Sequence, residues 1–157
     1  MFFDETKVFL KAGNGGDGCM SFLRQKYMPK GGPNGGNGGK GGDLILQADE
    51  NVADLRNYHF KKHWKAKNGE PGRGSDQNGR GGDPCILKVP MGTEVRELDS
   101  GELICELLDH EQEVLLLEGG KGGRGNATFK SSINQTPRQF TEGKIGMEGE
   151  YRFTLKT

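Results

Sequence analysis

Apolar residues along this chain occur in short runs, some alternating with polar residues and some continuous. Such runs are typical of β-strands, because successive strand side chains point to opposite faces. Helical periodicity over ten or more residues is absent, and only 51–58 suggests a short helical turn. Many short strands separated by turn signals predict a mainly β protein with a small barrel or sandwich. The predicted strands are 6–11, 43–48, 85–89, 93–98, 102–108, 113–118 and 150–156.

Glycine separates these runs and is unusually abundant. The chain has 28 glycines in 157 residues, whereas glycine averages about 7% of a protein. Hydrophobic residues make up only 31% of the chain, so we expect one compact core that does not extend along its whole length. The glycines gather in five tracts, 13–18, 31–42, 69–82, 119–125 and 143–149.

Within the tracts, glycine recurs every three residues, often in two interleaved series. A polyproline II helix has three residues per turn and no internal hydrogen bonds, so glycine at two of every three positions clears two of its faces. We therefore predict a bundle of polyproline II-like helices that exchange backbone hydrogen bonds. The remaining third positions, such as Lys40 and Arg124, should face outward. The predicted packing glycines are Gly32, Gly35, Gly36, Gly38, Gly39, Gly41, Gly42, Gly119, Gly120, Gly122, Gly123 and Gly125.

The alternative interpretation is that the tracts are flexible linkers. Linkers are usually rich in both glycine and serine, but these tracts contain only one serine, Ser75. Five disordered loops would also cost a small domain much conformational entropy. Collagen is excluded, because no long Gly-X-Y series occurs and proline totals only six.

The sequence contains only incomplete matches to phosphate-binding and catalytic motifs. Two GxGxxG matches occur, at 13–18 and 120–125, but no helix-forming segment follows the first. A Walker A loop needs Ser or Thr after Gly-Lys, and here glycine or isoleucine follows every Gly-Lys pair. The histidines His59 and His63 have the HExxH spacing, but residue 60 is Phe. We therefore expect no catalytic residue, cofactor site or metal site within this chain.

Charge is balanced in total but divided along the chain. Lys plus Arg and Asp plus Glu both number 22. Three segments, 18–42, 55–69 and 119–141, carry several Lys or Arg and no acid. Residues 97–118 contain eight acids and no Lys or Arg. Positive segments of this kind can bind the phosphates of a nucleic acid.

Aromatic residues interleave with the positive ones. Aromatic rings near Lys and Arg can stack on unpaired RNA bases, but buried rings belong to a core. We expect Phe60 and Trp64 to lie in the core and leave both possibilities open for Tyr27. If 59–67 is extended, His59, Lys61, His63, Lys65 and Lys67 share one strand face. The polar segment 128–140 suits backbone and 2′-hydroxyl contacts on RNA, or is an ordinary surface loop.

The cysteines and the apolar runs indicate the cellular compartment in which the protein is expected. Cys19, Cys85 and Cys105 are odd in number and form no CxxC pair, so neither a disulfide framework nor a zinc site is expected. No apolar run approaches the roughly 20 residues of a membrane span, and the first residues lack the apolar stretch of a signal peptide. A cytoplasmic protein, monomeric and without a membrane span, is expected.

Several long stretches resemble the N-terminal domain of the Obg GTPases, also called CgtA. They are "FLRQKYMPKGGPNGGNGGKGGD" (22–43), "HFKKHWKAKNGEPG" (59–72), "KVPMGTEV" (88–95) and "GGKGGRGNATFKSSINQTPRQFTEGKIGMEGE" (119–150). The resemblance covers essentially the whole chain. It implies a glycine-rich bundle, about 13–42, 69–83 and 119–149, on a β-barrel built from strands in about 2–11, 43–67, 84–118 and 150–157.

The resemblance also implies a function. Obg proteins are GTP hydrolases that use Mg²⁺, and they act in assembly of the large (50S) ribosomal subunit, with links to (p)ppGpp and the stringent response. The resemblance implies that this chain ends where a G domain would begin, so that GTP, GDP and Mg²⁺ belong to the missing domain. Expected partners are the large ribosomal subunit, with its 23S rRNA, and the protein's own G domain.

The family's loop tips are implied to contact rRNA. The matching segments here are 24–30, 73–80 and 130–138, of which 73–80 departs most from the family pattern. Three other interpretations stay open: a regulatory scaffold for the G domain, a disordered RGG-like RNA-binding chain without ribosome specificity, and a structural polyproline II protein. The expected contact residues are Arg24, Lys26, Tyr27, Lys30, Arg73, Arg80, Lys130, Ser131, Asn134 and Arg138.

Overall fold

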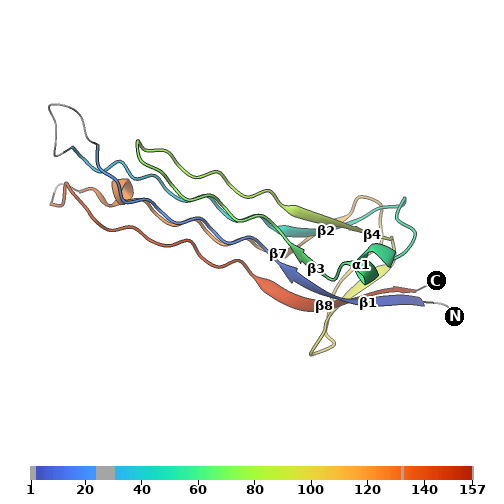
Figure 1. Ribbon diagram of the computed structural model, residues 1–157. Helices are drawn as coiled ribbons and strands as arrows, with labels where there is room; N and C mark the ends of the chain where they lie inside the picture. The colour runs from blue at the N-terminus through green and yellow to red at the C-terminus, as the bar shows by residue number, and fades with distance from the viewer. Residues whose placement is uncertain (1–2, 24–30, 132, 157) are drawn as a thin grey trace.

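A computed structural model describes residues 3–23, 31–131 and 133–156 of the protein (Figure 1). This part of the chain is mainly β, with one short helix α1 (Arg56–Phe60) and a 3₁₀ turn η1 (Asn126–Phe129). The mainly β class predicted from the apolar runs is confirmed. The strands are β1 (Phe3–Lys11), β2 (Leu44–Ala48), β3 (His63–Lys65), β4 (Cys85–Val89), β5 (Thr93–Glu97), β6 (Leu103–Leu107), β7 (Glu113–Leu117) and β8 (Glu148–Lys156).

The strands form two mixed sheets at one end of the molecule. The five-stranded sheet has the order β3-β1-β8-β5-β6, and the three-stranded sheet has the order β4-β2-β7. The long strands β1 and β8 are antiparallel, and Phe3 pairs with Lys156. Both ends of the described chain therefore lie together at the sheet end (Figure 1).

The core contains residues from both sheets. Along β2 the side chains alternate, so that Leu44, Leu46 and Ala48 are fully buried. Helix α1 adds Tyr58, whose ring packs edge-on against Phe153 with 5.3 Å between the ring centroids. The Tyr58 hydroxyl donates a hydrogen bond to the Lys88 carbonyl at 2.6 Å, which satisfies its polar end at the core boundary.

The segment 59–67 is not one extended strand. His59 lies in α1 and β3 begins only at His63, so the condition for the three lysines and two histidines to share one strand face is not met. The prediction that Phe60 is a core residue is wrong, because α1 turns Tyr58 inward and leaves Phe60 84% exposed. Trp64 is partly buried against the core, and its Nε1 donates to the Lys61 carbonyl at 2.8 Å.

The glycine tracts extend side by side from the sheets toward the opposite end of the molecule (Figure 1). Near the sheets, three tracts exchange backbone hydrogen bonds in a closed triangle. Gly41 donates to Gly120 at 2.9 Å, Gly120 donates to Gly13 at 2.9 Å, and Gly13 donates to Gly42 at 2.8 Å. Each tract therefore satisfies its backbone through its neighbours, as a helix without internal hydrogen bonds requires.

The same triangle of hydrogen bonds recurs three residues further along each of these three tracts. Gly38 donates to Gly123 at 2.8 Å, Gly123 donates to Gly16 at 2.8 Å, and Gly16 donates to Gly39 at 2.9 Å. The 13–18 and 119–125 tracts run in one direction, and the 31–42 tract runs in the other. The period of three in the sequence is thus the period of the hydrogen bonds between the tracts.

Absence of a Cβ atom, rather than backbone freedom, explains most of the glycines. Among the glycines, only Gly92 and Gly101 have positive φ, so the tract glycines use backbone conformations that other residues can also adopt. For eleven of the twelve predicted packing glycines, an added Cβ would lie 1.8–2.2 Å from a backbone oxygen of a neighbouring tract or of a residue close to one. Gly32 does not fit the prediction, because a Cβ there would meet only the Lys130 Nζ at 3.7 Å.

Not every third position faces water. Lys40, Lys121 and Arg124 are exposed as expected. Asn37 is half-buried instead, and its Oδ1 accepts a hydrogen bond from the Gly125 N–H at 2.9 Å. Its side chain therefore acts as part of the hydrogen-bond network between tracts.

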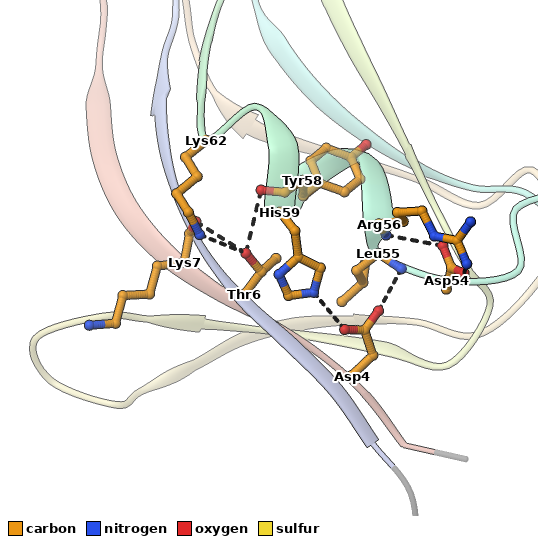
Figure 2. Close-up of polar contacts among 9 residues, drawn as sticks. All are labelled: Asp4, Thr6, Lys7, Asp54, Leu55, Arg56, Tyr58, His59 and Lys62. Atoms are coloured by element: carbon orange, nitrogen blue, oxygen red, sulfur yellow. Dashed lines mark hydrogen bonds and ion pairs between the residues drawn. The ribbon is translucent and has the colours of Figure 1, made fainter.

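Helix α1 is attached to β1 by a small polar cluster (Figure 2). The Asp4 carboxylate accepts hydrogen bonds from the Leu55 N–H at 2.7 Å and from His59 Nε2 at 2.7 Å. Burial raises the pKa of Asp4, but the hydrogen bonds from His59 and Leu55 outweigh that effect, and its pKa lies below the ordinary 3.8. Beside this pair, the Thr6 hydroxyl donates to the Tyr58 carbonyl at 3.4 Å.

The glycine packing predicts a sharp difference between two alanine substitutions. Gly38→Ala should lower the free energy of unfolding by about 3 kcal/mol, because its Cβ would lie 1.8 Å from the Gly16 carbonyl oxygen. Gly32→Ala should stay within about 0.5 kcal/mol of the parent chain. Urea unfolding followed by circular dichroism measures both, and equal losses would contradict the packing account.

The Asp4 cluster predicts a pH-dependent contribution to stability. Since the folded pKa of Asp4 lies below its unfolded value, the carboxylate stabilises the fold above pH 3.8, and that stability is lost as pH falls through the lowered pKa. Asp4→Asn should therefore be destabilising at neutral pH, with a difference that shrinks in acid. Asp99→Asn, at an exposed position, is the control in urea titrations, and a gap for Asp4→Asn that stays constant in acid would refute the linkage.

Candidate nucleic-acid interface

The turn inside the 69–82 tract and the described parts of the connections 18–31 and 125–143 lie at the end of the bundle farthest from the sheets and from both chain ends (Figure 1). Four of the expected contact residues, Arg24, Lys26, Tyr27 and Lys30, lie outside the described residues. The described part of this end consists of 19–23, 31–36, 73–77, 126–131 and 133–138, which we call the tip.

The first tip segment is a short two-stranded ladder. Phe22 and Pro33 form an isolated antiparallel bridge. On either side of it, Leu23 donates to the Gly32 carbonyl at 2.8 Å, and Asn34 donates to the Ser21 carbonyl at 2.9 Å. The backbone is therefore fixed up to the point where 24–30 begins.

The second tip segment is a tight turn at 74–77. Ser75 and Asp76 have φ of 60° and 56°, and the Gln77 N–H donates to the Gly74 carbonyl at 3.4 Å. Positive φ at both central positions is the type I′ pattern that joins antiparallel segments. The turn is held against the first segment, because Asp76 donates to the Asn34 carbonyl at 2.7 Å.

Asn126 joins the first tip segment to the third, and it was not among the predicted site residues. Its side chain is fully buried. Its Oδ1 accepts from Gly35 at 2.8 Å and Ser21 at 3.3 Å, and its Nδ2 donates to Ser21 at 2.9 Å and Pro137 at 3.1 Å. The signal was present in the sequence, because residue 126 continues the series 120, 123 and is the first member that is not glycine.

The third tip segment is an ordered polar loop. The Ser131 N–H donates to the Asn134 carbonyl at 2.9 Å, and the Ser131 hydroxyl accepts from the Asn134 N–H at 3.0 Å. The Asn134 Oδ1 in turn accepts from the Thr136 N–H at 3.2 Å. Ser131 and Asn134 thus hold the shape of the loop with backbone and side-chain atoms, and both residues remain exposed.

The described cations of the expected set are exposed, and three of the four lie at the tip. Lys130 reaches toward Gly32, and the Arg138 guanidinium lies over the Phe22 ring at 5.6 Å. The Arg73 carbonyl accepts from Gly36 at 2.9 Å, which places Arg73 beside the 74–77 turn. Arg80 lies further down the bundle, because it packs beside Gly39.

The described tip carries three exposed cations, Arg73, Lys130 and Arg138, and one exposed acid, Asp76. Within the described ranges, no ion pair involves Arg73, Arg80, Lys130 or Arg138. The eight acids of 97–118 lie instead in β5, β6, β7 and their connections, at the sheet end. Unpaired cations beside ordered polar loops can bind a phosphate backbone.

Other kinds of site receive no support from the described residues. No group of three or more His, Cys, Asp or Glu in that part of the chain could hold a metal ion. Nor does any helix there have the length and apolar character needed to cross a membrane.

Comparison with known proteins gives one family. The GTP1/OBG family matches residues 3–157. The chain is 49% identical over 156 residues to GTPase Obg of Sulfurihydrogenibium sp. (strain YO3AOP1), covering 99% of this chain and 45% of that protein. It is 50% identical over 145 residues to GTPase Obg of Orientia tsutsugamushi (strain Ikeda), covering 92% and 44%.

The chain thus spans less than half the length of these relatives. The family match nevertheless covers almost all of the chain itself, in agreement with the resemblance found in its sequence. This chain belongs to the GTP1/OBG family and corresponds to its Obg domain.

Proposed function

We propose that this domain docks on the large ribosomal subunit by inserting its tip into a cavity lined by 23S rRNA. The observation that carries the proposal is the separation of charge in the fold, with exposed, unpaired cations at the tip and the acidic segment at the sheet end. An approaching RNA surface would attract the tip and repel the opposite end.

The order of the tip supports the same proposal. A segment that is rigid before binding loses little conformational entropy when it docks. The hydrogen bonds of Asn126 and the type I′ turn at 74–77 hold the described tip backbone before any partner arrives. A disordered RGG-like chain would lack this order, so we favour docking on a defined surface.

The whole protein is proposed to be an Obg-type GTPase that acts in 50S subunit assembly and in growth and stress control. The two relatives named above are each called GTPase Obg, and this chain has no Gly-Lys pair followed by Ser or Thr. We therefore assign GTP, GDP and Mg²⁺ to a G domain outside this chain. The protein is further proposed to be monomeric and cytoplasmic, and three free cysteines agree with a reducing compartment.

Contact with that G domain is a second candidate role, located at the sheet end. Exposed apolar residues occur at both ends, with Ile133 at the tip, and the group Phe60, Ile86 and Leu115 on α1, β4 and β7 supports a contact at the sheet end. The two roles use opposite ends of the molecule and are compatible.

Removing tip charge should weaken docking and reduce its salt dependence. A Lys130→Ala/Arg138→Ala chain should bind large subunits at least about tenfold more weakly at physiological salt, with a log–log salt slope smaller by about two. The matched control, Lys7→Ala/Arg56→Ala, removes the same charges from the sheet end. Pelleting with purified large subunits across a salt series measures both, and equal behaviour of the two variants would refute docking through the tip.

The division of labour between domains predicts where nucleotide binds. The 157-residue chain should neither bind nor hydrolyse GTP, whereas the longer protein should do both in a Mg²⁺-dependent manner. Fluorescent-GTP titration and phosphate release measure the two activities. Hydrolysis by the 157-residue chain itself would overturn the assignment of the nucleotide to a separate domain.

A further inference from the structure

One large apolar side chain of the tip, that of Ile133, lies almost entirely in water. It is 96% exposed, more than any other large apolar residue in the described ranges. Single exposed apolar side chains are common on protein surfaces, so exposure by itself assigns no role to this residue. The loop that carries Ile133 and the charges around it supply the further evidence.

The loop around Ile133 is held in shape on both sides of this residue. The Ser131 N–H donates to the Asn134 carbonyl at 2.9 Å, and the Asn134 N–H donates to the Ser131 hydroxyl at 3.0 Å. Further along, Pro137 is buried, and its carbonyl accepts a hydrogen bond from Asn126 Nδ2 at 3.1 Å. The fold thus holds an isoleucine in water on a hydrogen-bonded loop, at the end of the molecule that a docking partner meets first.

The surroundings of Ile133 are positive and polar. Lys130 and Arg138 lie on either side of it in the chain and are both exposed, and residues 119–141 contain no acid. A partner that accepts an apolar group between two cations must combine negative charge with apolar surface. RNA offers both, because its phosphates are negative and the faces of its bases pack against apolar and aromatic groups.

We propose that Ile133 acts as an apolar wedge that packs against the faces of bases in the rRNA cavity. Proteins that bind nucleic acids insert apolar side chains, isoleucine among them, between base steps. The proposal rests on the RNA-docking function proposed above and adds to it a contact that does not depend on charge. Lys130 and Arg138 attract the RNA backbone from a distance, whereas Ile133 contributes only once its side chain is in contact.

The two kinds of contact respond differently to salt. A cation that neutralises a phosphate releases a counterion, so its contribution to affinity falls as the salt concentration rises. Burial of an apolar side chain involves no charge, so its contribution stays nearly the same across a salt series. A variant of Ile133 should therefore lower the affinity at every salt concentration and leave the salt slope unchanged.

The test compares Ile133→Ala with Ile133→Phe in the 157-residue chain. Alanine removes most of the apolar side chain, whereas phenylalanine keeps an apolar group and offers a flat face on which bases stack. Ile145→Ala is the matched control, because Ile145 is also largely exposed, at 78%, but lies in the 143–149 tract outside the tip. Pelleting with purified large subunits across a salt series gives the affinities, and urea unfolding gives the stabilities.

Ile133→Ala should bind large subunits about tenfold more weakly at every salt concentration, because burial of an isoleucine side chain is lost. Its salt slope and its free energy of unfolding should equal those of the parent chain, since the side chain is in water before docking. Ile133→Phe should bind at least as tightly as the parent, and Ile145→Ala should bind as the parent does. A photoreactive p-benzoylphenylalanine placed at position 133 should crosslink to 23S rRNA in the docked complex.

Three results would overturn the wedge and leave docking through the tip intact, provided that Lys130→Ala/Arg138→Ala still weakens binding. One is parent-like binding by Ile133→Ala. Another is a smaller salt slope or a lower stability of that variant, which would make Ile133 a residue that positions the cations. The third is a crosslink from position 133 to a ribosomal protein in place of rRNA. Failure of the parent chain to bind large subunits would instead remove the docking function on which the wedge rests.

Discussion

The structure depends on one constraint, which is that each glycine tract must find its hydrogen-bond partners in other tracts. An extended helix with three residues per turn cannot bond to itself, so its amides and carbonyls require neighbours at backbone contact distance. At eleven of the predicted packing positions a single Cβ would fill that space. Glycine therefore does here what apolar side chains do at the sheet end, where Leu44, Leu46 and Phe153 are fully buried. The two halves of the domain are held together by different physical interactions, and no large apolar core is needed to make the bundle stiff.

That stiffness connects the fold with the proposed docking function. The bundle carries the tip away from the sheets (Figure 1), and Asn126 joins the first and third tip segments through four side-chain hydrogen bonds. Arg138 is held over Phe22, and the other tip cations have no acidic partner in the described ranges. A cationic surface kept in shape before binding suits a partner that is itself rigid and negatively charged. The sheet end, which holds the acidic segment and the exposed Phe60, is left for a different kind of contact.

The sequence was most informative where a period controls the structure. Strand positions such as 85–89 follow from alternation and apolar runs, and the bundle follows from the three-residue glycine series. Prediction failed where one residue's environment depends on distant segments. Phe60 is exposed because α1 presents Tyr58 to the core instead, and Gly32 lies at the end of its series, where an added Cβ would meet no neighbouring backbone atom. The contacts of the buried Asn126 amide could not be predicted, although its place in the series 120, 123 marked the residue, because its partners Ser21 and Gly35 lie 105 and 91 residues away in the chain.

The repeating triangles of hydrogen bonds also restrict how the length of this domain can change. One level joins Gly13, Gly41 and Gly120, and the next joins Gly16, Gly38 and Gly123. Adding or removing a single residue within one tract would shift every later level in that tract against its neighbours. The reach of the tip from the sheets can therefore grow or shrink only in steps of three residues, taken in several tracts at once. The length of the bundle is therefore set in steps of three residues, whereas the loops beyond its last level of hydrogen bonds can vary in length one residue at a time.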